Sequence, residues 1–279
     1  KRVHNYINTK EECLCEINRA KKELLKKQIV PGWGWYQMNF LCVPKKNGET
    51  GLLTEIRVAR HGSYARASDV SLNDVVTEEA RRMKLPQFEE YVLLMYAYKY
   101  ASLRDLKDAF RQLLLTLDDS QYVQYSLFGL TFRDRCVAYG EAGAAACCQE
   151  FSLLIIWICE NKLEEFKGKK NRMTVHVDDF LILANSGAEV RILAAAFDRL
   201  CAELGAKISV EKNEDAITRG IVHGFGFKIS RELHELEDEF VKTVFVPLDK
   251  ACDIITGSLI LLTHKSGTGA ALECLTGRI

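Results

Sequence analysis

The sequence predicts a mixed α+β fold in which antiparallel strands pack on helices. Extended runs rich in β-branched and aromatic residues come in pairs separated by short turns, and segments with helical spacing of apolar residues lie between them. With 279 residues, of which 48% are hydrophobic, the chain can bury a sizeable core and form two subdomains around one cleft. No apolar run approaches the roughly 18 residues of a membrane span.

The first predicted helix begins with a capping box formed by Thr9 and Glu12. Apolar residues then recur at helical spacing until Pro31-Gly32 stops the helix. These apolar residues are Leu14, Ile17, Leu24 and Leu25.

A hairpin is predicted next, because Asn47-Gly48 separates the extended runs 38–43 and 52–58. Just before it, Trp33 and Trp35 either pack beneath this hairpin, which we favour, or stack on nucleic-acid bases. The polar stretch 77–85 is expected to be helical, and 151–159 is expected to be part of a core helix. Further along, 187–204 predicts a helix that ends at Gly205, and 206–210 predicts a strand.

Two adjacent aspartates, Asp178 and Asp179, interrupt the apolar run VHVDDFLIL. The flanking residues predict a strand, a tight turn that carries both acids, and a return strand. Adjacent carboxylates repel each other and resist burial, so they must be kept hydrated or neutralised, for example by a pair of divalent cations. The alternative is a surface hairpin with Asp-Asp in its turn by chance, although such turns favour Asn-Gly or Asp-Gly.

A third acid, Asp105, lies 73 positions before Asp178, after the extended stretch 96–103 and before a helix-like turn. Taken alone, Asp105 could be the N-cap of an amphipathic helix. That interpretation leaves unexplained why an isolated aspartate, an aromatic residue five positions later and a double aspartate occur together. The inner side of such a helix would carry Leu106, Ala109, Phe110, Leu113 and Leu114.

At these residues the chain resembles the reverse transcriptases of retroelements, most closely those of LTR retrotransposons and of tyrosine-recombinase retroelements. In that family DLKDAF is the first catalytic motif, and a (Y/V)xDD hairpin followed by FLI is the second. The resemblance implies that Asp105, Asp178 and Asp179 are the catalytic, metal-binding carboxylates. It also implies that Phe110 is the aromatic gate that stacks under the sugar and rejects a 2′-hydroxyl.

Further motifs follow in the family's order, and the resemblance covers roughly residues 40–279. LGAKISVEKNE resembles the motif that carries a lysine near the incoming triphosphate, which gives Lys212 that role. HGFGFKIS resembles the FLGFxIS hairpin that grips the primer end and includes Gly226 and Phe227. FLCVPKKNGE resembles the fingers hairpin. The helix-entry motif FGLxxAPxxFQ, which includes nucleotide-binding Gly140, is matched by Tyr139, Gly140, Ala144, Ala145 and Gln149.

Two of these motifs depart from the family pattern. The chain has GAAACC where the helix-entry motif has its proline, and SDVSLN, with Ser71 near the place of the arginine, where the fingers have VDxRxLN. Arg57, Arg60 and Arg66 are candidate phosphate-binding substitutes for that arginine. The departures affect nucleotide binding and leave the three carboxylates in place.

The resemblance implies a right-hand polymerase fold of fingers and palm, with an antiparallel palm sheet packed on helices and little or no thumb. The segments would be an N-terminal helical extension (1–37), fingers (38–95), a palm with finger elements (96–246), and the start of a thumb or connection segment (247–279). Two Mg²⁺ ions, or Mn²⁺ in their place, would lie about 3.5–4 Å apart. Asp105 and Asp178 would bind both ions, and Asp179 would be less essential.

Two function classes follow. The first is an RNA-directed DNA polymerase that extends a primer 3′-hydroxyl by a two-metal mechanism on an RNA or DNA template, with deoxynucleoside triphosphates as substrates. The alternative is a domesticated, catalytically weakened reverse-transcriptase-like domain that serves as a structural or RNA-binding subunit of a larger ribonucleoprotein assembly. Because the chain begins at Lys1 rather than at methionine, we expect it to be part of a longer product such as a polyprotein.

Charge and cysteine content are compatible with both classes. The net charge is zero, but residues 1–66 hold 13 Lys and Arg against 6 Asp and Glu, and residues 67–279 hold 25 against 32. A basic amino-terminal lobe suits fingers that clasp template and triphosphate, although charges scattered on solvated faces would give the same count. Ten cysteines without metal-site spacing or a signal-like start indicate buried thiols in a reducing, intracellular compartment.

Overall fold

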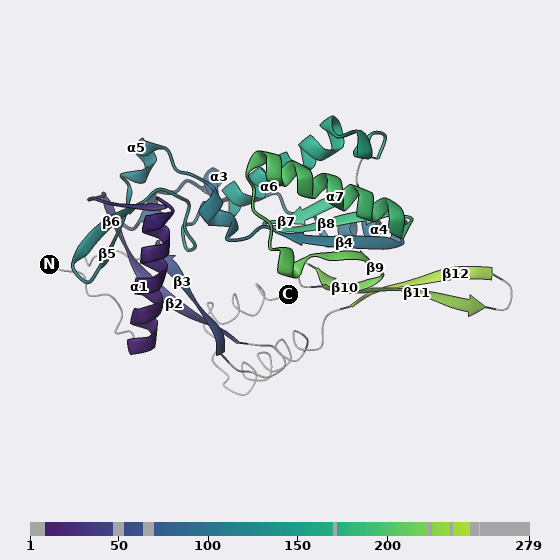
Figure 1. Cartoon of the computed structure of the whole chain (residues 1–279), viewed down its shortest axis with the longest axis horizontal. Helices are drawn as coiled ribbons and strands as arrows, with labels where there is room; N and C mark the ends of the chain where they lie inside the picture. The colour runs from purple at the N-terminus through teal and green to yellow at the C-terminus, as the bar shows by residue number, and fades with distance from the viewer. Residues whose placement is uncertain are drawn as a thin grey trace. The chain divides into compact units, whose positions relative to one another are not determined.

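The computed structural model describes residues 9–46, 53–63, 70–169, 172–222, 225–234, 237–245 and 251 (Figure 1). These residues form helices and mainly antiparallel sheets, so the predicted mixed α+β class is confirmed. The chain folds into two compact units that are each assembled from discontinuous segments. Unit 1 comprises 1–85, 106–157 and 201–208, and unit 2 comprises 86–105, 158–200 and 209–279.

Unit 1 contains a five-stranded sheet in the order β1-β6-β5-β2-β3. All neighbours are antiparallel except β2 and β5, which run parallel. The pairing of β2 with β3 confirms the predicted hairpin, whose turn lies outside the described residues. The strands are β1 (Ile29–Pro31), β2 (Tyr36–Lys46), β3 (Leu53–His61), β5 (Val123–Leu127) and β6 (Leu130–Asp134).

Helix α1 (Lys10–Leu25) begins as the sequence predicts but buries a different face. The capping box is present, because the Glu12 N–H donates to Thr9 Oγ1 at 3.2 Å and the Thr9 N–H donates to Glu12 Oε2 at 2.7 Å. The buried residues of the helix are Glu16, Ala20 and Glu23, whereas the apolar Leu25 is 87% exposed. The acidic face turns inward because Glu23 has arginine partners inside unit 1.

These partners form a buried ion cluster of two acids and two bases. Arg60 Nη2 lies 2.9 Å from Glu23 Oε2, and Arg60 Nε lies 3.1 Å from Asp134 Oδ2. Arg111 Nη1 lies 2.6 Å from Asp134 Oδ1, and Arg111 Nε lies 3.4 Å from Glu23 Oε1. All four side chains are at most 4% exposed, so the charges compensate one another in the interior. The guanidinium of Arg60 also stacks on the buried ring of Tyr125.

The prediction that Trp33 and Trp35 pack beneath the hairpin is wrong. Their side chains are 80% and 77% exposed. The residue between them is held against β5, because the Gly34 N–H donates to Gln124 Oε1 at 2.6 Å and a Cβ at Gly34 would lie 2.8 Å from the Gln121 carbonyl oxygen. With Gly34 facing the sheet, both neighbouring indoles lie exposed.

Unit 1 also contains short helical segments. One predicted helix is shorter than expected, and another does not form. The predicted helix 77–85 extends only over α3. The amphipathic helix considered after Asp105 does not form, since only a 3₁₀ turn, η1, follows the strand. The segments are α2 (Leu72–Val75), α3 (Glu78–Arg81), η1 (Ala109–Gln112) and α5 (Leu117–Ser120).

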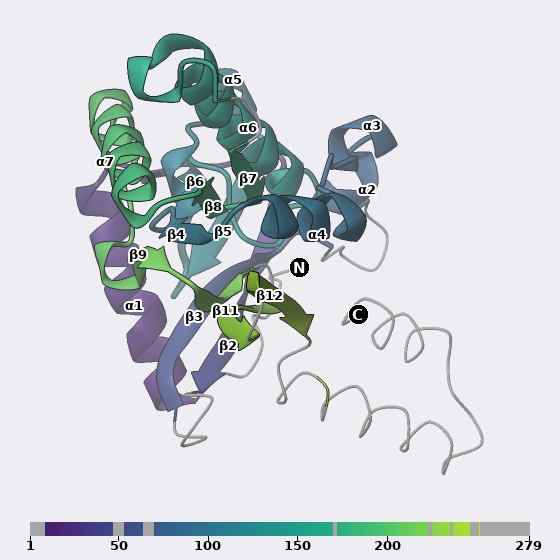
Figure 2. The same cartoon turned by 90° about the vertical axis from the view of Figure 1, so that its right-hand side faces the viewer.

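Unit 2 contains a four-stranded antiparallel sheet in the order β7-β8-β4-β9. Figure 2 shows this sheet between helices α7 and α4. On one face Tyr91 and Met95 of α4 pack against Leu181 of β8, and on the other Phe180 contacts Phe197 of α7 with ring centroids 4.8 Å apart. The elements are α4 (Phe88–Ala97), β4 (Tyr100–Asp105), β7 (Met173–His176), β8 (Asp179–Ala184), α7 (Gly187–Leu204) and β9 (Glu214–Ile217).

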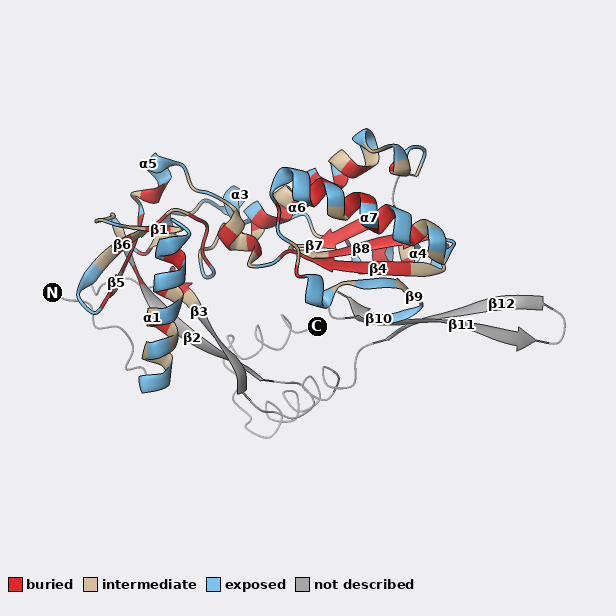
Figure 3. Cartoon of the chain, viewed as in Figure 1, coloured by how far each residue is buried: buried red, intermediate tan, exposed pale blue. Residues whose placement is uncertain are grey.

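Burial on both faces explains why the sequence of β8 is continuously apolar after Asp179. Figure 3 shows β4 and β8 buried along nearly their whole length, and each strand has one partly exposed residue. Strand β4 begins at Tyr100, because Tyr96, which we expected to be extended, belongs to α4.

The remaining predicted elements are partly confirmed. Helix α6 (Ala144–Lys162) includes the predicted core helix, and α7 ends before Gly205, which has a positive φ of 73°. The predicted strand 206–210 is wrong: a single bridge at Ile208 is followed by the 3₁₀ turn η3 (Val210–Lys212). A second 3₁₀ turn, η2 (Glu164–Phe166), follows α6. We find no candidate membrane-spanning helix in the part of the chain that the structure describes.

The carboxyl-terminal part of unit 2 forms a separate three-stranded antiparallel sheet, β10-β11-β12. The pairing of β10 with β11 agrees with the hairpin expected at HGFGFKIS. The segment expected to begin a thumb, 247–279, lies outside the described residues apart from 251. The strands are β10 (Arg219–Val222), β11 (Phe225–His234) and β12 (Glu237–Phe245).

The cysteines of the described residues are all free thiols. Cys147 is exposed, in contrast to the buried thiols that the sequence analysis expected. Cys13 and Cys15 are partly buried. The four buried thiols are Cys136, Cys148, Cys159 and Cys201.

Candidate active site

The hairpin of β7 and β8 carries the double aspartate at its tip. His176 pairs with Asp179, so Val177 and Asp178 form the two-residue turn and Asp179 begins β8. This corrects the prediction that both acids occupy the turn. Val177 has φ +60°, which is rare for a β-branched residue. In two-residue hairpin turns, a positive φ at the first position is usually adopted by glycine. Such a conformation costs about 1–3 kcal/mol, and the buried strands on either side hold it in place.

Asp105 joins the pair through the register of the sheet. It is the last residue of β4 and lies directly opposite Asp179 on the antiparallel strand β8. The side chains of Asp105 and Asp179 are hydrogen-bonded, and Asp178 lies close enough to Asp105 for their charges to interact. The structure therefore brings together three carboxyl groups that are far apart in the sequence.

Burial and the charges of neighbouring acids keep the carboxyl groups of Asp178 and Asp179 from ionising easily. Burial raises the pKa of Asp178, and the charge of Asp105 raises it further. Burial, followed by the charges of Asp178 and Asp105 and the hydrogen bond with Asp105, raises the pKa of Asp179 to about 7. The site is therefore an acidic cluster that attracts positive charge.

Lys212 supplies positive charge to this cluster. Its Nζ donates to Asp105 Oδ2 at 2.6 Å, and its side chain is half exposed. The backbone places it there, because the Ser209 N–H donates to the Asp105 carbonyl at 2.8 Å and so holds η3 against the end of β4. The lysine that the sequence analysis assigned to the triphosphate thus lies beside the three aspartates.

The donor set of this cluster suits a hard dication, although it is not arranged as a finished metal site. Within the described ranges, no group of three or more His, Cys, Asp and Glu side chains is arranged to hold a metal ion. In this arrangement Lys212 neutralises Asp105 Oδ2. Carboxylate oxygens are nevertheless the ligands that Mg²⁺ prefers, and a cation would relieve the repulsion that raises the pKa of Asp178 and Asp179.

Arg104, which the sequence analysis missed, anchors the strand that ends in Asp105. Its Nε and Nη2 lie 2.8 and 3.0 Å from the two carboxylate oxygens of Asp198 in α7, and Nη2 also lies 2.8 Å from Asp215 Oδ1 in β9. Arg104 is only 4% exposed. An arginine in the extended run YASLRD, next to the first acid, was the available signal, but nothing in the sequence identified its partners.

The predicted nucleotide-side residues Phe110 and Gly140 belong to unit 1. The Phe110 ring packs edge-on against Tyr139, with ring centroids 4.5 Å apart. Gly140 has φ +100°, and a Cβ there would lie 1.6 Å from the Arg60 carbonyl oxygen, so only glycine fits. The close approach is held by the Arg60 N–H, which donates to the Tyr139 carbonyl at 2.7 Å, and by Asn73 Nδ2, which donates to the Gly140 carbonyl at 3.1 Å.

The proposed phosphate-binding role of Arg60 is corrected by its burial. Although burial lowers the pKa of Arg60, Asp134 and Glu23 raise it overall, so the group is a permanently charged member of the buried cluster. Ser71, near the place of the family's arginine, is 2% exposed and caps α2 by accepting a hydrogen bond from the Asp74 N–H. The side chain of Arg57 and the whole of Arg66 lie outside what the structure describes.

The predicted primer-grip residues lie in β11. Gly226 pairs with Ile221 of β10 and Phe245 of β12, and Phe227 pairs with Gly220 and Val244. Their backbone is described and their side chains are not, so their role stays a prediction.

No protein-family model and no curated protein matches the chain. Solved structures of foamy viral protease-reverse transcriptase are similar to it. The complex with dsDNA has a TM-score of 0.63 at 15% identity and covers 100% of this chain and 48% of that one. The complex with RNA/DNA hybrid has a TM-score of 0.61 at 14% identity and covers 100% of this chain and 32% of that one. The dRH form with dsDNA has a TM-score of 0.62 at 16% identity and covers 82% of this chain and 35% of that one.

At these identities the similarity shows the fold alone, and this chain has a reverse-transcriptase-like fold. It spans between about a third and a half of the length of these solved chains.

Proposed function

We propose that this chain is a reverse-transcriptase domain of a retroelement, of the LTR-retrotransposon or tyrosine-recombinase type, that catalyses template-directed nucleotidyl transfer to a primer 3′-hydroxyl. The observation that carries the proposal is the position of Asp105 opposite Asp179, with Asp178 in the adjoining turn, within a reverse-transcriptase-like fold. In this proposal the β7-β8-β4-β9 sheet of unit 2 is the palm, and the β2-β3 hairpin of unit 1 belongs to the fingers.

Primer-template and deoxynucleoside triphosphates are the proposed partners. Support for nucleic-acid binding comes from the similar foamy viral proteins, which were solved with dsDNA and with an RNA/DNA hybrid. Phe110 would limit the sugar, Tyr139 and Gly140 would border the nucleotide, and Gly226 and Phe227 would contact the primer end.

Asp105, Asp178 and Asp179 would hold two Mg²⁺ ions, which, when bound, lower the pKa of the attacking hydroxyl and offset the charge of the leaving pyrophosphate. The side chains of the protein would contribute mainly by holding the reactants in position. Asp178 and Asp179, whose pKa values are raised by burial and by the neighbouring acids, would bind the ions in their ionised form. Lys212 would leave Asp105 to interact with the triphosphate. No nucleophilic side chain is needed, because the primer hydroxyl attacks the α-phosphorus directly.

Primer extension on poly(rA)/oligo(dT) tests this proposal. We expect Asp105→Asn and Asp178→Asn each to abolish extension with Mg²⁺ and with Mn²⁺, and Asp179→Asn to reduce it less. Asp118→Asn, a matched change at an exposed aspartate of α5 outside the cluster, should leave extension unchanged. Thermal unfolding followed by circular dichroism should show that all four variants remain folded.

Extension that survives Asp105→Asn or Asp178→Asn would refute the catalytic assignment. Binding of primer-template by an unmutated chain that never extends the primer would instead support the alternative of a nucleic-acid-binding scaffold.

A further inference from the structure

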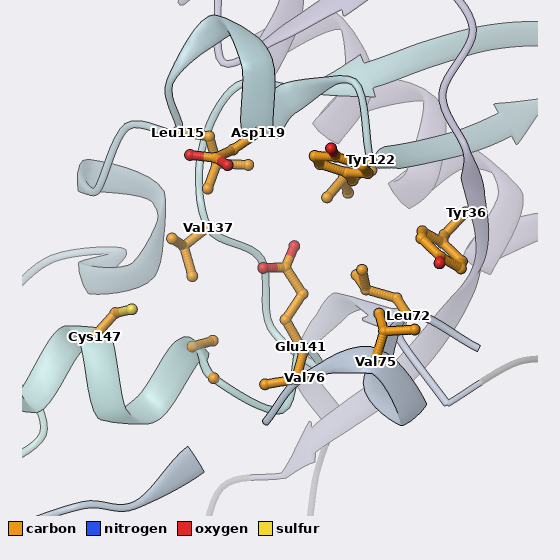
Figure 4. Close-up of a pocket in the computed structure, with 13 residues that line it drawn as sticks. Tyr36, Leu72, Val75, Val76, Leu115, Asp119, Tyr122, Val137, Glu141 and Cys147 are labelled. Atoms are coloured by element: carbon orange, nitrogen blue, oxygen red, sulfur yellow. The ribbon is translucent and has the colours of Figure 1, made fainter. Parts of the chain in front are cut away.

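Unit 1 contains a pocket that the proposed polymerase chemistry does not use. Its volume is about 450 Å³, which lies within the roughly 300–1,000 Å³ of small-molecule sites (Figure 4). It lies between α2, the segments on either side of α5, and the first turn of α6. Most of its walls are apolar, formed chiefly by Leu72, Val75, Val76, Leu115, Val123 and Val137.

The carboxyl group of Glu141 points into this apolar space (Figure 4). Figure 4 shows the Glu141 side chain reaching from the loop before α6 toward the middle of the pocket. Its Oε1 is buried and has no hydrogen-bond partner within the described part of the chain. In the motif FGLxxAPxxFQ the third position is leucine, so an apolar side chain would fill the place that Glu141 takes here. Nothing in the resemblance therefore accounts for an acid at this position.

The surroundings leave the charge of Glu141 incompletely compensated. Burial raises the pKa of Glu141 to about 8, and the charge of Asp134 adds to this effect. A backbone hydrogen bond from Ala138 and the charges of Arg111 and Arg60 oppose it, but both arginines are already paired with Glu23 and Asp134. None of the described residues that line the pocket is a lysine or arginine.

The other polar residues described in the pocket wall do not supply a hydrogen-bond donor to Glu141 Oε1. Asp119 is an acid and is itself engaged, since Thr116 Oγ1 donates to its carboxylate at 2.6 Å and accepts from its N–H at 3.0 Å. Tyr36 and Tyr122 present aromatic rings at the side of the pocket (Figure 4). The pocket thus combines apolar and aromatic walls with an acceptor that lacks its donor.

We propose that this pocket binds a small aromatic amine, whose rings lie against the apolar wall and whose ammonium group donates to Glu141 Oε1. Burying the rings supplies the hydrophobic part of the affinity, and the charge-assisted hydrogen bond satisfies an oxygen that is costly to leave unpaired. A carboxylate or phosphate ligand is disfavoured, because Asp119 would repel it and none of the described lining residues is a lysine or arginine that could bind it. The assignment stands whether or not unit 2 catalyses polymerisation.

Calorimetric titration with 4-phenylbenzylamine and its uncharged counterpart 4-phenylbenzyl alcohol tests the proposal. The amine should bind the unmutated chain roughly tenfold or more tightly than it binds Glu141→Gln, whereas the alcohol should bind both equally. At pH 7 the amine should also release close to one proton on binding, measured from buffers of different ionisation enthalpy, because it must displace the proton that Glu141 retains. Glu141→Gln should release none.

Three further variants locate the site. Glu141→Leu, which restores the apolar residue of the motif, should bind the alcohol and lose the preference for the amine. Cys147→Phe should block both probes, because exposed Cys147 lines the pocket. Asp118→Asn, an exposed acid outside the pocket wall, should change nothing. Equal affinity of the amine for the unmutated chain and Glu141→Gln, or no binding of either probe to the unmutated chain, would overturn the proposal.

Discussion

Asp105 and Asp179 lie directly opposite each other on adjacent antiparallel strands, one as the last residue of β4 and the other as the first residue of β8. A register slip of one residue would turn one of the two carboxyl groups to the other face of the sheet. The buried run 180–184 secures the register, because its side chains pack against α4 on one face of the sheet and α7 on the other. The acidic cluster is therefore a product of core packing.

Lys212→Met should increase the extent to which Mg²⁺ stabilises the folded chain. Lys212 Nζ lies 2.6 Å from Asp105 Oδ2, so a divalent cation bound by Asp105 must compete with it. Without Mg²⁺ the variant should lose about 1 kcal/mol of unfolding free energy, since the Lys212 side chain is half exposed. The rise in melting temperature when EDTA is replaced by Mg²⁺ should be larger than in the unmutated chain. Lys207→Met, at an exposed lysine nearby in the sequence, is the control. An equal Mg²⁺ response in all three proteins would contradict the competition.

Val177→Gly should stabilise the chain. Val177 has φ +60°, and glycine at this position would remove a backbone strain of about 1–3 kcal/mol. Glycine also raises the entropy of the unfolded chain, which costs about 0.5–1 kcal/mol of stability. We therefore expect the unfolding free energy to rise by about 1 kcal/mol. Chemical denaturation measures this change. Val175→Gly, a matched change in the buried interior of β7, should instead cost more than about 2 kcal/mol. A loss of stability in Val177→Gly would show that the turn conformation carries no strain.

Arg60→Met should destabilise unit 1 without changing nucleotide affinity. The change leaves buried Glu23 and Asp134 with one of their shared arginines removed, which should cost about 3–5 kcal/mol. Arg82→Met, which breaks an exposed pair with Glu78, should cost less than about 0.5 kcal/mol. Urea denaturation gives both values. If Arg60→Met kept its stability and raised the KM for deoxynucleoside triphosphate, Arg60 would be a phosphate ligand after all.

Glu141 should make stability depend on pH. In the unfolded chain its pKa is near 4.5, whereas in the folded chain it is about 8, so between these values the folded state holds one more proton. Its contribution to stability is complete below about pH 4.5, falls by at most about 1.4 kcal/mol per pH unit up to about pH 8, and is constant above that. Denaturant titrations across this range should show the decline in the unmutated chain and its absence in Glu141→Gln. A free-energy difference between the two proteins that does not change with pH would contradict this linkage.

Local patterns in the sequence predicted the elements whose cause is local. The capping box at Thr9, the hairpin of β2 and β3, the helix that ends at Gly205 and the strand that follows Asp178 are all specified by neighbouring residues. The candidate acids were also found this way, because paired carboxylates within an apolar run conflict with burial. Where local preference and tertiary contacts disagreed, as for the predicted strand 206–210, the contacts decided the conformation.

By itself, then, the sequence determined the mixed α+β class and identified Asp105, Asp178 and Asp179 as candidates for one site. Only the tertiary structure decided which groups meet. It turned the acidic face of α1 inward toward Arg60 and Arg111, left Trp33 and Trp35 exposed, and placed Lys212 on Asp105. The physical reason is that the free energy of a buried charge depends on partners far away in the chain, and a sequence pattern contains no measure of that distance.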